Sequence, residues 1–527
     1  MSRQMSRFFA ALLFCPLLLC GCGQEPLPEK DYLKTADYPL ETDQTLKYWI
    51  TDETDIPGYH DRSSFPIMQA WSKETGVDID WVIVPTNLAE QQFNILMASG
   101  DLPDIVEWSW GDIKYGAEKA IRDGNITPLN DYTEYMPNLI HLFEENPIYD
   151  KMSKTDSGCY YYFPNLRELG PDGYKLLVTS GYMMRQDYLD RLGLPIPQTI
   201  SQWYTTLKAF QTIEGVKYPL AINIEELRYG LVGAFGIDLD FYQENGVVKY
   251  GRIQPAYRSF LEEMHKWFAE GLLDQNAAIL DYDLTVSKFT KGESAATFGW
   301  IGSRMGKINK DGQAMDPNFS LTAVPFPTLQ EGERPKFTPK EPVVQTKGAA
   351  VSNKCKHKEL AIKFLDFGYG EQGNLLMNYG TEGVSYTMED GQPTYTELIF
   401  NNSNGLSINE AMLLYVRSIS TGPYLQNIRY IEQYYTTPEQ KAAQELWKET
   451  DADLHRMPPI TLTAEESEEY VRLIGAISEY AEDMELRFIY GQTSLSEFDQ
   501  YIQTMYDLGV GRAIELQQNA LERYNRR

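Results

Sequence analysis

Early in the chain, the spacing of apolar positions switches repeatedly between the period of a strand and that of a helix. Residues 46–50, 77–84 and 104–108 are short apolar or β-branched runs typical of strands. The stretches between them repeat apolar residues every three or four positions, and each is followed by a glycine that suits a helix C-cap, Gly76 and Gly100. Strand and helix in alternation with short links predict a parallel sheet with right-handed crossovers.

Helical spacing dominates later regions of the chain. Pro255 opens a strongly amphipathic stretch that Gly271 closes. Thr463 and Glu466 form a capping box ahead of a second apolar stripe, and residues 496–524 predict a final helix pair. The chain is therefore expected to be a mixed α/β protein with helices added at its C-terminal end.

The N-terminal segment has the parts of a secretory signal. Arg3 and Arg7 precede an apolar run over residues 8–19, which is too short to span a membrane. The run ends in Leu19-Cys20-Gly21-Cys22, which resembles the bacterial lipobox. The alternative is a plain secretory signal with an incidental cysteine.

The lipobox interpretation divides the N-terminal part of the chain. Residues 1–21 are expected to be removed as a signal peptide, and Cys22 is expected to carry the lipid. Residues 22–40 contain prolines and acids but little apolar content, so they are predicted to form a tether. No later apolar run reaches spanning length, so lipid is the only expected membrane anchor.

Composition narrows the possible functions. The 527 residues suffice for two or three domains, and the formal charge of −28 argues against binding to nucleic acid or adsorption on anionic lipid. Beyond the lipobox only Cys159 and Cys355 remain, too few for a disulfide framework. They could pair, but free thiols are favoured.

Chemical motifs are scarce, whereas aromatic residues are abundant. The five histidines show no metal-binding spacing, and there is no nucleophile elbow or phosphate-binding glycine loop. We therefore expect no catalytic residue, no metal and no cofactor. The 36 Tyr, 22 Phe and 9 Trp fill a core in part, but tyrosine and tryptophan also suit a surface that binds a flat, hydroxylated solute.

Several segments, in the same order along the chain, resemble one family. They are residues 93–105 (FNILMASGDLPDI), 181–190, 192–195, 289–296 (FTKGESAA), 358–366, 379–386 (YGTEGVSY) and 520–524. Together they resemble the family 1 extracellular solute-binding proteins of ATP-driven importers, the carbohydrate-binding relatives of maltose-binding protein, and especially their large lipoprotein branch. The segments are spread over most of the mature chain.

This resemblance implies a two-lobe periplasmic-binding-protein type II (Venus-flytrap) α/β fold with additional C-terminal helices. The matching segments place lobe one at 41–163 plus 292–346 and lobe two at 164–291 plus 347–527. A ligand is expected in the cleft between the lobes. The expected partners are a carbohydrate and the transmembrane subunits of an ABC permease with their ATPase, and the protein is expected to be a monomer, lipid-anchored outside the cytoplasm.

One segment departs from the family pattern. Many long relatives carry a calcium loop just after the helix that matches residues 199–210, whereas residues 211–217 here read QTIEGVK. One glutamate does not supply the several oxygen ligands that calcium needs, so we expect no structural calcium at this place.

Candidate ligand-binding residues lie beside predicted strand ends and family loops. Open α/β sheets bind ligands where strands end. The candidates are Asp52 and Glu53 after the first strand, Glu107, Trp108 and Trp110 after another, Trp300 as the main stacking residue, and Glu382 and Tyr386 from a lobe-two loop. Core packing is the alternative for any single tryptophan. Arg185 and Asp187 are expected to pair with each other structurally.

Three functions remain open at this point. The first is capture of a carbohydrate, an oligosaccharide, for import. The second is capture of a peptide or another polar solute by the same fold. The third is an enzyme or a surface glycan adhesin on the same lipid anchor.

Overall fold

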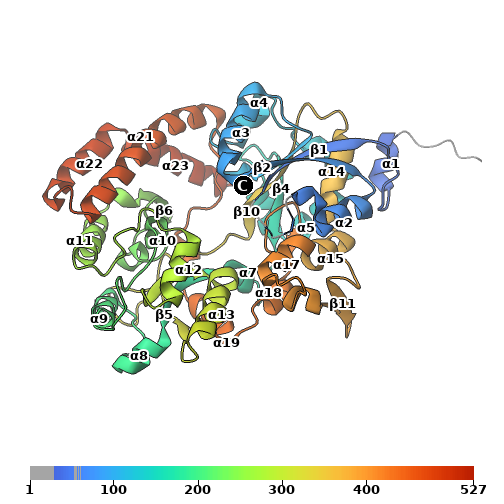
Figure 1. The fold of residues 1–527 in the computed structure, drawn as a ribbon. Coiled ribbons are helices and arrows are strands. Elements are labelled where there is room, and N and C mark those ends of the chain that lie inside the picture. Colours follow the sequence, from blue (N-terminus) through green and yellow to red (C-terminus); the bar gives the residue numbers. More distant parts are fainter. Residues whose placement is uncertain (1–28, 53–55, 57, 60) are drawn as a thin grey trace, which may run out of the picture.

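The computed structural model describes residues 29–527 except 53–55, 57 and 60, and these fold into two lobes, each built around its own sheet (Figure 1). Lobe one holds a six-stranded sheet in the order β13-β4-β10-β3-β1-β2. Its strands are β1 (Thr45–Asp52), β2 (Asp78–Pro85), β3 (Ile105–Ser109), β4 (Phe163–Arg167), β10 (Val344–Val351) and β13 (Leu425–Gln426). The two-lobe α/β architecture confirms the expected fold class.

The first strands of lobe one are parallel, as the apolar spacing predicts. β1 pairs with both β2 and β3, so that Tyr48 lies opposite Trp81 on one side and Ile105 on the other. The connecting helices are α2 (Pro66–Thr75) and α3 (Thr86–Ser99). They end at Gly76 and Gly100, whose φ angles of 72° and 61° are the left-handed conformation of a glycine C-cap.

Helices cover both faces of this sheet. They are α4 (Ala117–Arg122), α5 (Pro137–Glu145), α6 (Pro147–Ser153), α14 (Lys358–Asp366), α15 (Glu371–Tyr379) and α17 (Ile408–Tyr415). In the core between sheet and helices, the rings of Trp71 and Phe364 stack at 4.8 Å. Large aromatic side chains thus fill much of the lobe-one interior, which accounts for part of the aromatic excess.

The folded part of the chain begins earlier than the sequence suggests. Helix α1 (Glu29–Thr35) packs on lobe one with Leu33 buried, the Tyr38 hydroxyl donates to the Lys363 carbonyl at 2.6 Å, and the Leu40 amide donates to the Thr75 carbonyl at 2.8 Å. The expectation that all of residues 22–40 form a tether is therefore wrong. Leu33, Tyr38 and Leu40 are spaced too widely to register as an apolar pattern, but each finds a partner in lobe one.

Lobe two is built around a smaller antiparallel sheet in the order β8-β5-β9. Its strands are β5 (Ser180–Arg185), β8 (Ala296–Trp300) and β9 (Leu321–Ala323), and its main helices are α8 (Gln186–Leu192), α9 (Ile200–Phe210), α10 (Ile224–Arg228), α11 (Pro255–Ala269), α12 (Tyr282–Thr290) and α13 (Gly306–Met315). A hairpin of β6 (Phe241–Glu244) and β7 (Val247–Tyr250) lies beside them. Arg185 and Asp187 form the expected ion pair, with Nη2 2.6 Å from Oδ2.

The lobe boundaries differ from the expected ones. β8 pairs with β5, with Phe298 opposite Tyr182, so the part of 292–346 that precedes β10 belongs to lobe two. β10 pairs with β3 and β4, and α14 and α15 follow it onto lobe one, so much of 347–426 belongs there. β4, β10 and β13 belong to the lobe-one sheet, whereas β5, β8 and β9 form the lobe-two sheet. The chain therefore crosses between the lobes after β4, before β10 and after β13.

The C-terminal helices are α21 (Ala464–Ile489), α22 (Phe498–Asp507) and α23 (Val510–Tyr524). Thr463 and Glu466 form the predicted capping box, with amide-to-side-chain distances of 3.2 and 3.0 Å. These helices pack on α11 and β7 of lobe two, and the beginning of α21 reaches α4 of lobe one (Figure 1). Two short helices, α18 (Ile428–Tyr434) and α19 (Pro438–Trp447), also pack on lobe two, where α19 contacts β9. Among the helices of the described residues, none has the length and apolar content needed to cross a bilayer.

Candidate ligand-binding cleft

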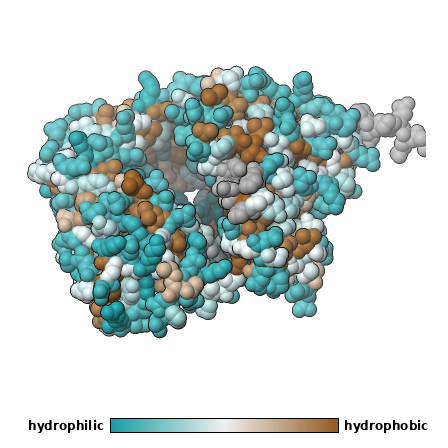
Figure 2. Space-filling view, viewed as in Figure 1, coloured by the Kyte–Doolittle hydropathy of each residue, from teal (hydrophilic) through white to brown (hydrophobic). Residues whose placement is uncertain are grey.

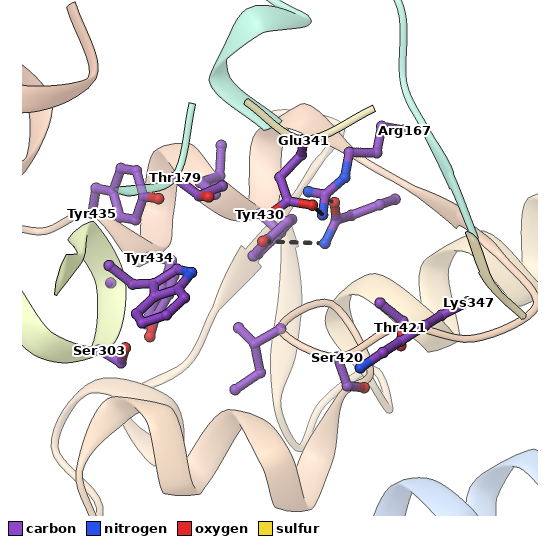
Figure 3. Close-up of a pocket in the computed structure, with 15 residues that line it drawn as sticks. Arg167, Thr179, Ser303, Glu341, Lys347, Ser420, Thr421, Tyr430, Tyr434 and Tyr435 are labelled. Atoms are coloured by element: carbon purple, nitrogen blue, oxygen red, sulfur yellow. Dashed lines mark hydrogen bonds and ion pairs between the residues drawn. The ribbon is translucent and has the colours of Figure 1, made fainter. Parts of the chain in front are cut away.

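The surface is hollowed near the centre of the molecule, where the two lobes face each other (Figure 2). A pocket of about 260 Å³ lies in this region and is lined from both lobes (Figure 3). Lobe one and the segments next to it contribute Arg167, Lys347, Ser420 and Thr421. Lobe two and the segments that connect it to lobe one contribute Thr179, Trp300, Ser303, Glu341, Tyr430, Tyr434 and Tyr435. The lining therefore combines aromatic faces with hydroxyl and charged groups.

Trp300 provides an open aromatic face to this pocket. It is the last residue of β8 and is 40% exposed, although its edge packs against Phe298 at a centroid distance of 6.2 Å. A π-helical turn over Ile301–Met305 follows at once, and a Cβ on Gly302 would lie 2.1 Å from the Tyr434 ring. Only a glycine allows the Tyr434 ring to lie this close to the backbone beside Trp300.

The opposite wall rests on a buried ion pair. Arg417 donates through Nη2 to Glu107 Oε1 at 2.7 Å and to the Thr421 carbonyl at 2.5 Å, and the Tyr48 hydroxyl donates to Glu107 Oε2 at 2.8 Å. The Arg417 side chain is 2% exposed and that of Glu107 10%. Both carboxylate oxygens of Glu107 thus accept hydrogen bonds from the protein. Glu107, which was expected to bind the ligand, instead holds in place the loop that carries Ser420 and Thr421.

Polar groups form the floor of the pocket. Arg167, at the end of β4, donates through Nη1 to Gln426 Oε1 at 2.7 Å and to the Leu176 carbonyl at 2.6 Å. Its Nη2 lies 3.7 Å from Glu341 Oε2, and the Gln426 amide donates to the Tyr430 hydroxyl at 3.2 Å (Figure 3). Because the Glu341 side chain is 35% exposed, its carboxylate remains open to a solute.

The other two expected tryptophans lie apart from this pocket. Trp110 is fully buried, and its indole N–H donates to the Val106 carbonyl at 2.8 Å. Trp108 is half-buried and stacks on Phe93 at 4.5 Å. Both pack with α3 in lobe one, so in this structure core packing accounts for Trp110 completely and for one face of Trp108.

The remaining candidates are also separated from the pocket. Glu382 is exposed, while Tyr386 is buried against Tyr379 at a centroid distance of 5.9 Å, and neither lines it. β1 ends at Asp52, whose side chain lies, with Glu53 and Cys22, outside the described part of the chain. The pocket thus retains Trp300 from the predicted set.

Sequence reasoning missed the residues that come from the lobe crossings. Arg167, Glu341 and the loop over 417–421 lie at or near ends of strands of the lobe-one sheet, but β4, β10 and β13 were not predicted as strands. The closely spaced tyrosines at 430, 434 and 435 were a usable signal, because three phenols within six residues suit a polar, aromatic surface.

No grouping of three or more His, Cys, Asp or Glu side chains suited to a metal ion occurs among the described residues. Where relatives carry a calcium loop, the Gln211 amide donates to the Glu270 carbonyl at 2.8 Å, and Lys217 pairs with Glu293 at 2.9 Å.

Cys159 and Cys355 are free thiols, and burial raises their pKa values to about 11 and about 12. Both thiols are therefore protonated and poorly reactive near neutral pH.

Two α/β lobes, joined by several crossings and facing each other across an aromatic and polar pocket, define a binding protein that holds a solute between its halves. Residues 63–375 match the family of bacterial extracellular solute-binding proteins, and the chain belongs to this family.

Several relatives are similar over more than half of the chain. The fructooligosaccharide ABC transporter substrate-binding protein FusA of Streptococcus pneumoniae is 25% identical over 98% of this chain and 97% of its own. The lipoprotein LipO of Bacillus subtilis is 24% identical over 83% of both chains. The polygalacturonan/rhamnogalacturonan-binding protein YtcQ of the same organism is 25% identical over 59% of this chain and 61% of its own.

Solved structures show the same fold. The alginate-binding protein AlgQ2, in a form without calcium ion, superposes with a TM-score of 0.77 at 25% identity, covering 92% of this chain and 100% of the other. FusA from S. pneumoniae in complex with kestose gives a TM-score of 0.74 at 21% identity, covering 92% and 99%.

Proposed function

We propose that the protein captures an oligosaccharide between its lobes and delivers it to the permease of an ATP-binding-cassette importer. The observation that carries this proposal is the open Trp300 face beside polar groups from the facing lobe. A sugar ring has an apolar face and a rim of hydroxyls, and it fits an aromatic surface surrounded by hydrogen-bonding groups. The relatives named for fructooligosaccharide, galacturonan and alginate support the same class of ligand.

Ligand binding is coupled to closure of the lobes. Trp300 belongs to lobe two, whereas Ser420 and Thr421 are held by the Arg417–Glu107 pair of lobe one. Only a closed form lets one ligand touch both walls fully, so the ligand shifts the equilibrium toward closure, and the permease reads the closed shape.

The anchor belongs to the same proposal. The lipobox-like sequence at Cys22 and the similarity to the lipoprotein LipO support a lipid anchor on the outer side of the cell membrane. Such an anchor keeps the binding protein close to its permease at high effective concentration.

Isothermal titration of the mature chain with a panel of glycans and peptides tests the ligand class. We expect binding of an oligosaccharide without turnover. Binding of peptides and of no glycan would overturn the proposal in favour of a peptide-binding protein, and release of shortened products would identify an enzyme.

Substitution of Trp300 tests the stacking role. We expect Trp300→Ala to weaken the identified glycan at least about tenfold, equivalent to ~1.4 kcal/mol, and Trp300→Phe to weaken it less because a ring remains. Tyr506→Ala is a matched control, since Tyr506 is 52% exposed on α22 and far from the pocket. Unchanged affinity in Trp300→Ala would remove Trp300 from the site.

A further inference from the structure

We propose that the binding surface continues from Trp300 to a second sugar-binding position at Tyr229, so that the ligand spans at least two subsites on lobe two. This proposal rests on the proposed function. Tyr229 directly follows α10 and is 45% exposed, slightly more than Trp300.

Tyr229 and Trp300 share one aromatic support. The Tyr229 ring lies 5.6 Å from that of Phe298, and the Trp300 ring lies 6.2 Å from it. The two exposed rings are therefore no more than about 12 Å apart on the wall of lobe two. This is a spacing that two units of a single sugar chain can bridge, each unit against one ring.

A second cavity of about 420 Å³ lies beside Tyr229. One segment of the chain passes from this cavity to the first pocket. Thr338 and Pro339 line this cavity, and Glu341 lines the first pocket. Burial, followed by nearby carboxylates that include Glu341, raises the pKa of Tyr229. The phenol thus stays protonated and can donate a hydrogen bond to a ligand oxygen.

Arg456 is one of the charged groups that line this cavity, together with carboxylates that include Asp238 and Asp240. Among the described residues its guanidinium forms no hydrogen bond and no ion pair within 4 Å, although Asp453, Asp238 and Glu341 lie near enough to attract it. Burial is the larger effect and lowers its pKa. A partly desolvated guanidinium with no hydrogen-bond acceptor is unfavourable, and its planar set of donors fits a pair of acceptor oxygens. Adjacent hydroxyls or the carboxylate of a uronic acid unit both present such a pair.

A buried ion pair fixes the spacing of the two subsites. Arg304, 2% exposed, donates through Nη1 to the Phe298 carbonyl at 2.6 Å and to the Glu226 carboxylate, and its guanidinium lies 5.9 Å from the Trp300 ring centroid. Glu226 belongs to α10 and forms its capping box with Asn223. The same arginine therefore connects the strand that ends at Trp300 to the helix that Tyr229 directly follows.

A chain-length series tests the second subsite. Calorimetry would compare mono-, di-, tri- and tetrasaccharides of the glycan type that the wild-type protein binds. We expect Tyr229→Ala to weaken the longer glycans at least about tenfold and the monosaccharide less than twofold, whereas Trp300→Ala weakens all of them. Tyr229→Phe should retain most of the affinity, and Tyr506→Ala all of it.

Other outcomes separate this proposal from the one it rests on. A Tyr229→Ala variant that melts like wild type and has the same effect at every length, or none, overturns the second subsite alone. A wild-type protein that binds no glycan overturns both proposals.

Arg456→Gln distinguishes the two sources of acceptor oxygens. A loss that is greater for uronate-containing than for neutral chains assigns Arg456 to a carboxylate, and an equal loss assigns it to hydroxyls. No loss for either kind of chain overturns its role in the subsite.

Discussion

Asp366 is a buried carboxylate that holds two helices of lobe one together. It ends α14 and accepts hydrogen bonds from the backbone amides of Asn138 and Leu139, at 3.2 and 2.9 Å, in the first turn of α5. Such bonds satisfy amides that lack partners at a helix start. Burial nevertheless dominates and raises the Asp366 pKa to about 7, against an unfolded value of about 3.9.

This pKa makes the stability of lobe one depend on pH in a defined direction. The folded state binds the proton more tightly than the unfolded state, so the stabilisation is fully present below about pH 4 and is lost as pH rises through about 7. Relative to Asp366→Asn, the wild type should lose on the order of 4 kcal/mol of unfolding free energy across this window. Urea titrations from pH 4.5 to 8 measure this difference, with Asp499→Asn on the surface of α22 as control. Parallel pH curves for wild type and Asp366→Asn would contradict the assignment.

At the scale of elements, α21 is attached to lobe two through one fully buried acid. Glu485 receives Arg228 Nε at 2.9 Å, Arg252 Nη1 at 2.5 Å and the Tyr257 hydroxyl at 3.1 Å. Its side chain is completely buried and that of Arg252 nearly so. Removing one partner from such a cluster leaves a buried charge without compensation.

We therefore expect Glu485→Gln to lower the unfolding free energy by about 3 kcal/mol or more. Glu482→Gln is the matched control, because Glu482 lies one turn earlier on the same helix, is 53% exposed and reaches Arg228 only at 3.9 Å. The control should change stability by less than about 0.5 kcal/mol. Denaturant unfolding measures both variants, and equal effects would show that Glu485 is not the attachment point.

The helices and strands visible in the sequence are those whose signals are local. Apolar period, glycine C-caps and the Thr463–Glu466 capping box located α2, α3, α11 and α21 to within a few residues. The pairing of β8 with β5 has no such signal, because it joins segments more than a hundred residues apart, and this misplaced the lobe boundary. Arg417 and Glu107 are likewise far apart in the sequence, so no local signal shows that the Glu107 carboxylate has a partner. Trp300 could be predicted as a binding residue because an aromatic residue at a strand end is itself a signal. Tyr229 can be recognised as a candidate only in the structure, where its ring lies beside that of Phe298.

At the scale of the whole molecule, the C-terminal helices join both lobes. The end of α21 nearest Thr463 lies on lobe one, where Arg122 Nη1 is 2.8 Å from Glu465 Oε1. Close by, Asp156 of lobe one accepts from Arg523 at 2.7 Å and from Arg527 at 2.6 Å, while the other half of α21 lies in the core of lobe two. Any hinge motion must accommodate or break these contacts.

We expect Asp156→Asn to broaden the distribution of distances between the lobes in the ligand-free protein. Spin labels at Ile95 of lobe one and Leu284 of lobe two, both exposed, report this distance by double electron–electron resonance. Asp150→Asn is a suitable control, because Asp150 binds Lys154 and Tyr160 within lobe one. A distribution that stays the same in Asp156→Asn would show that these arginines do not restrain opening.

If Cys22 carries the proposed lipid, helix α1 limits how the molecule can be oriented on a membrane. With an acylated Cys22, the seven residues 22–28 separate the lipid from the first turn of α1, a reach of at most about 25 Å even when fully extended. α1 lies at the outer edge of lobe one, away from lobe two (Figure 1). Lobe one would then be anchored close to the bilayer at its outer edge, and lobe two would be the lobe that moves when the cleft opens and closes. A permease would meet the mouth of the cleft at a nearly constant height and from a restricted range of angles, so docking would begin from a pre-aligned encounter rather than from free tumbling.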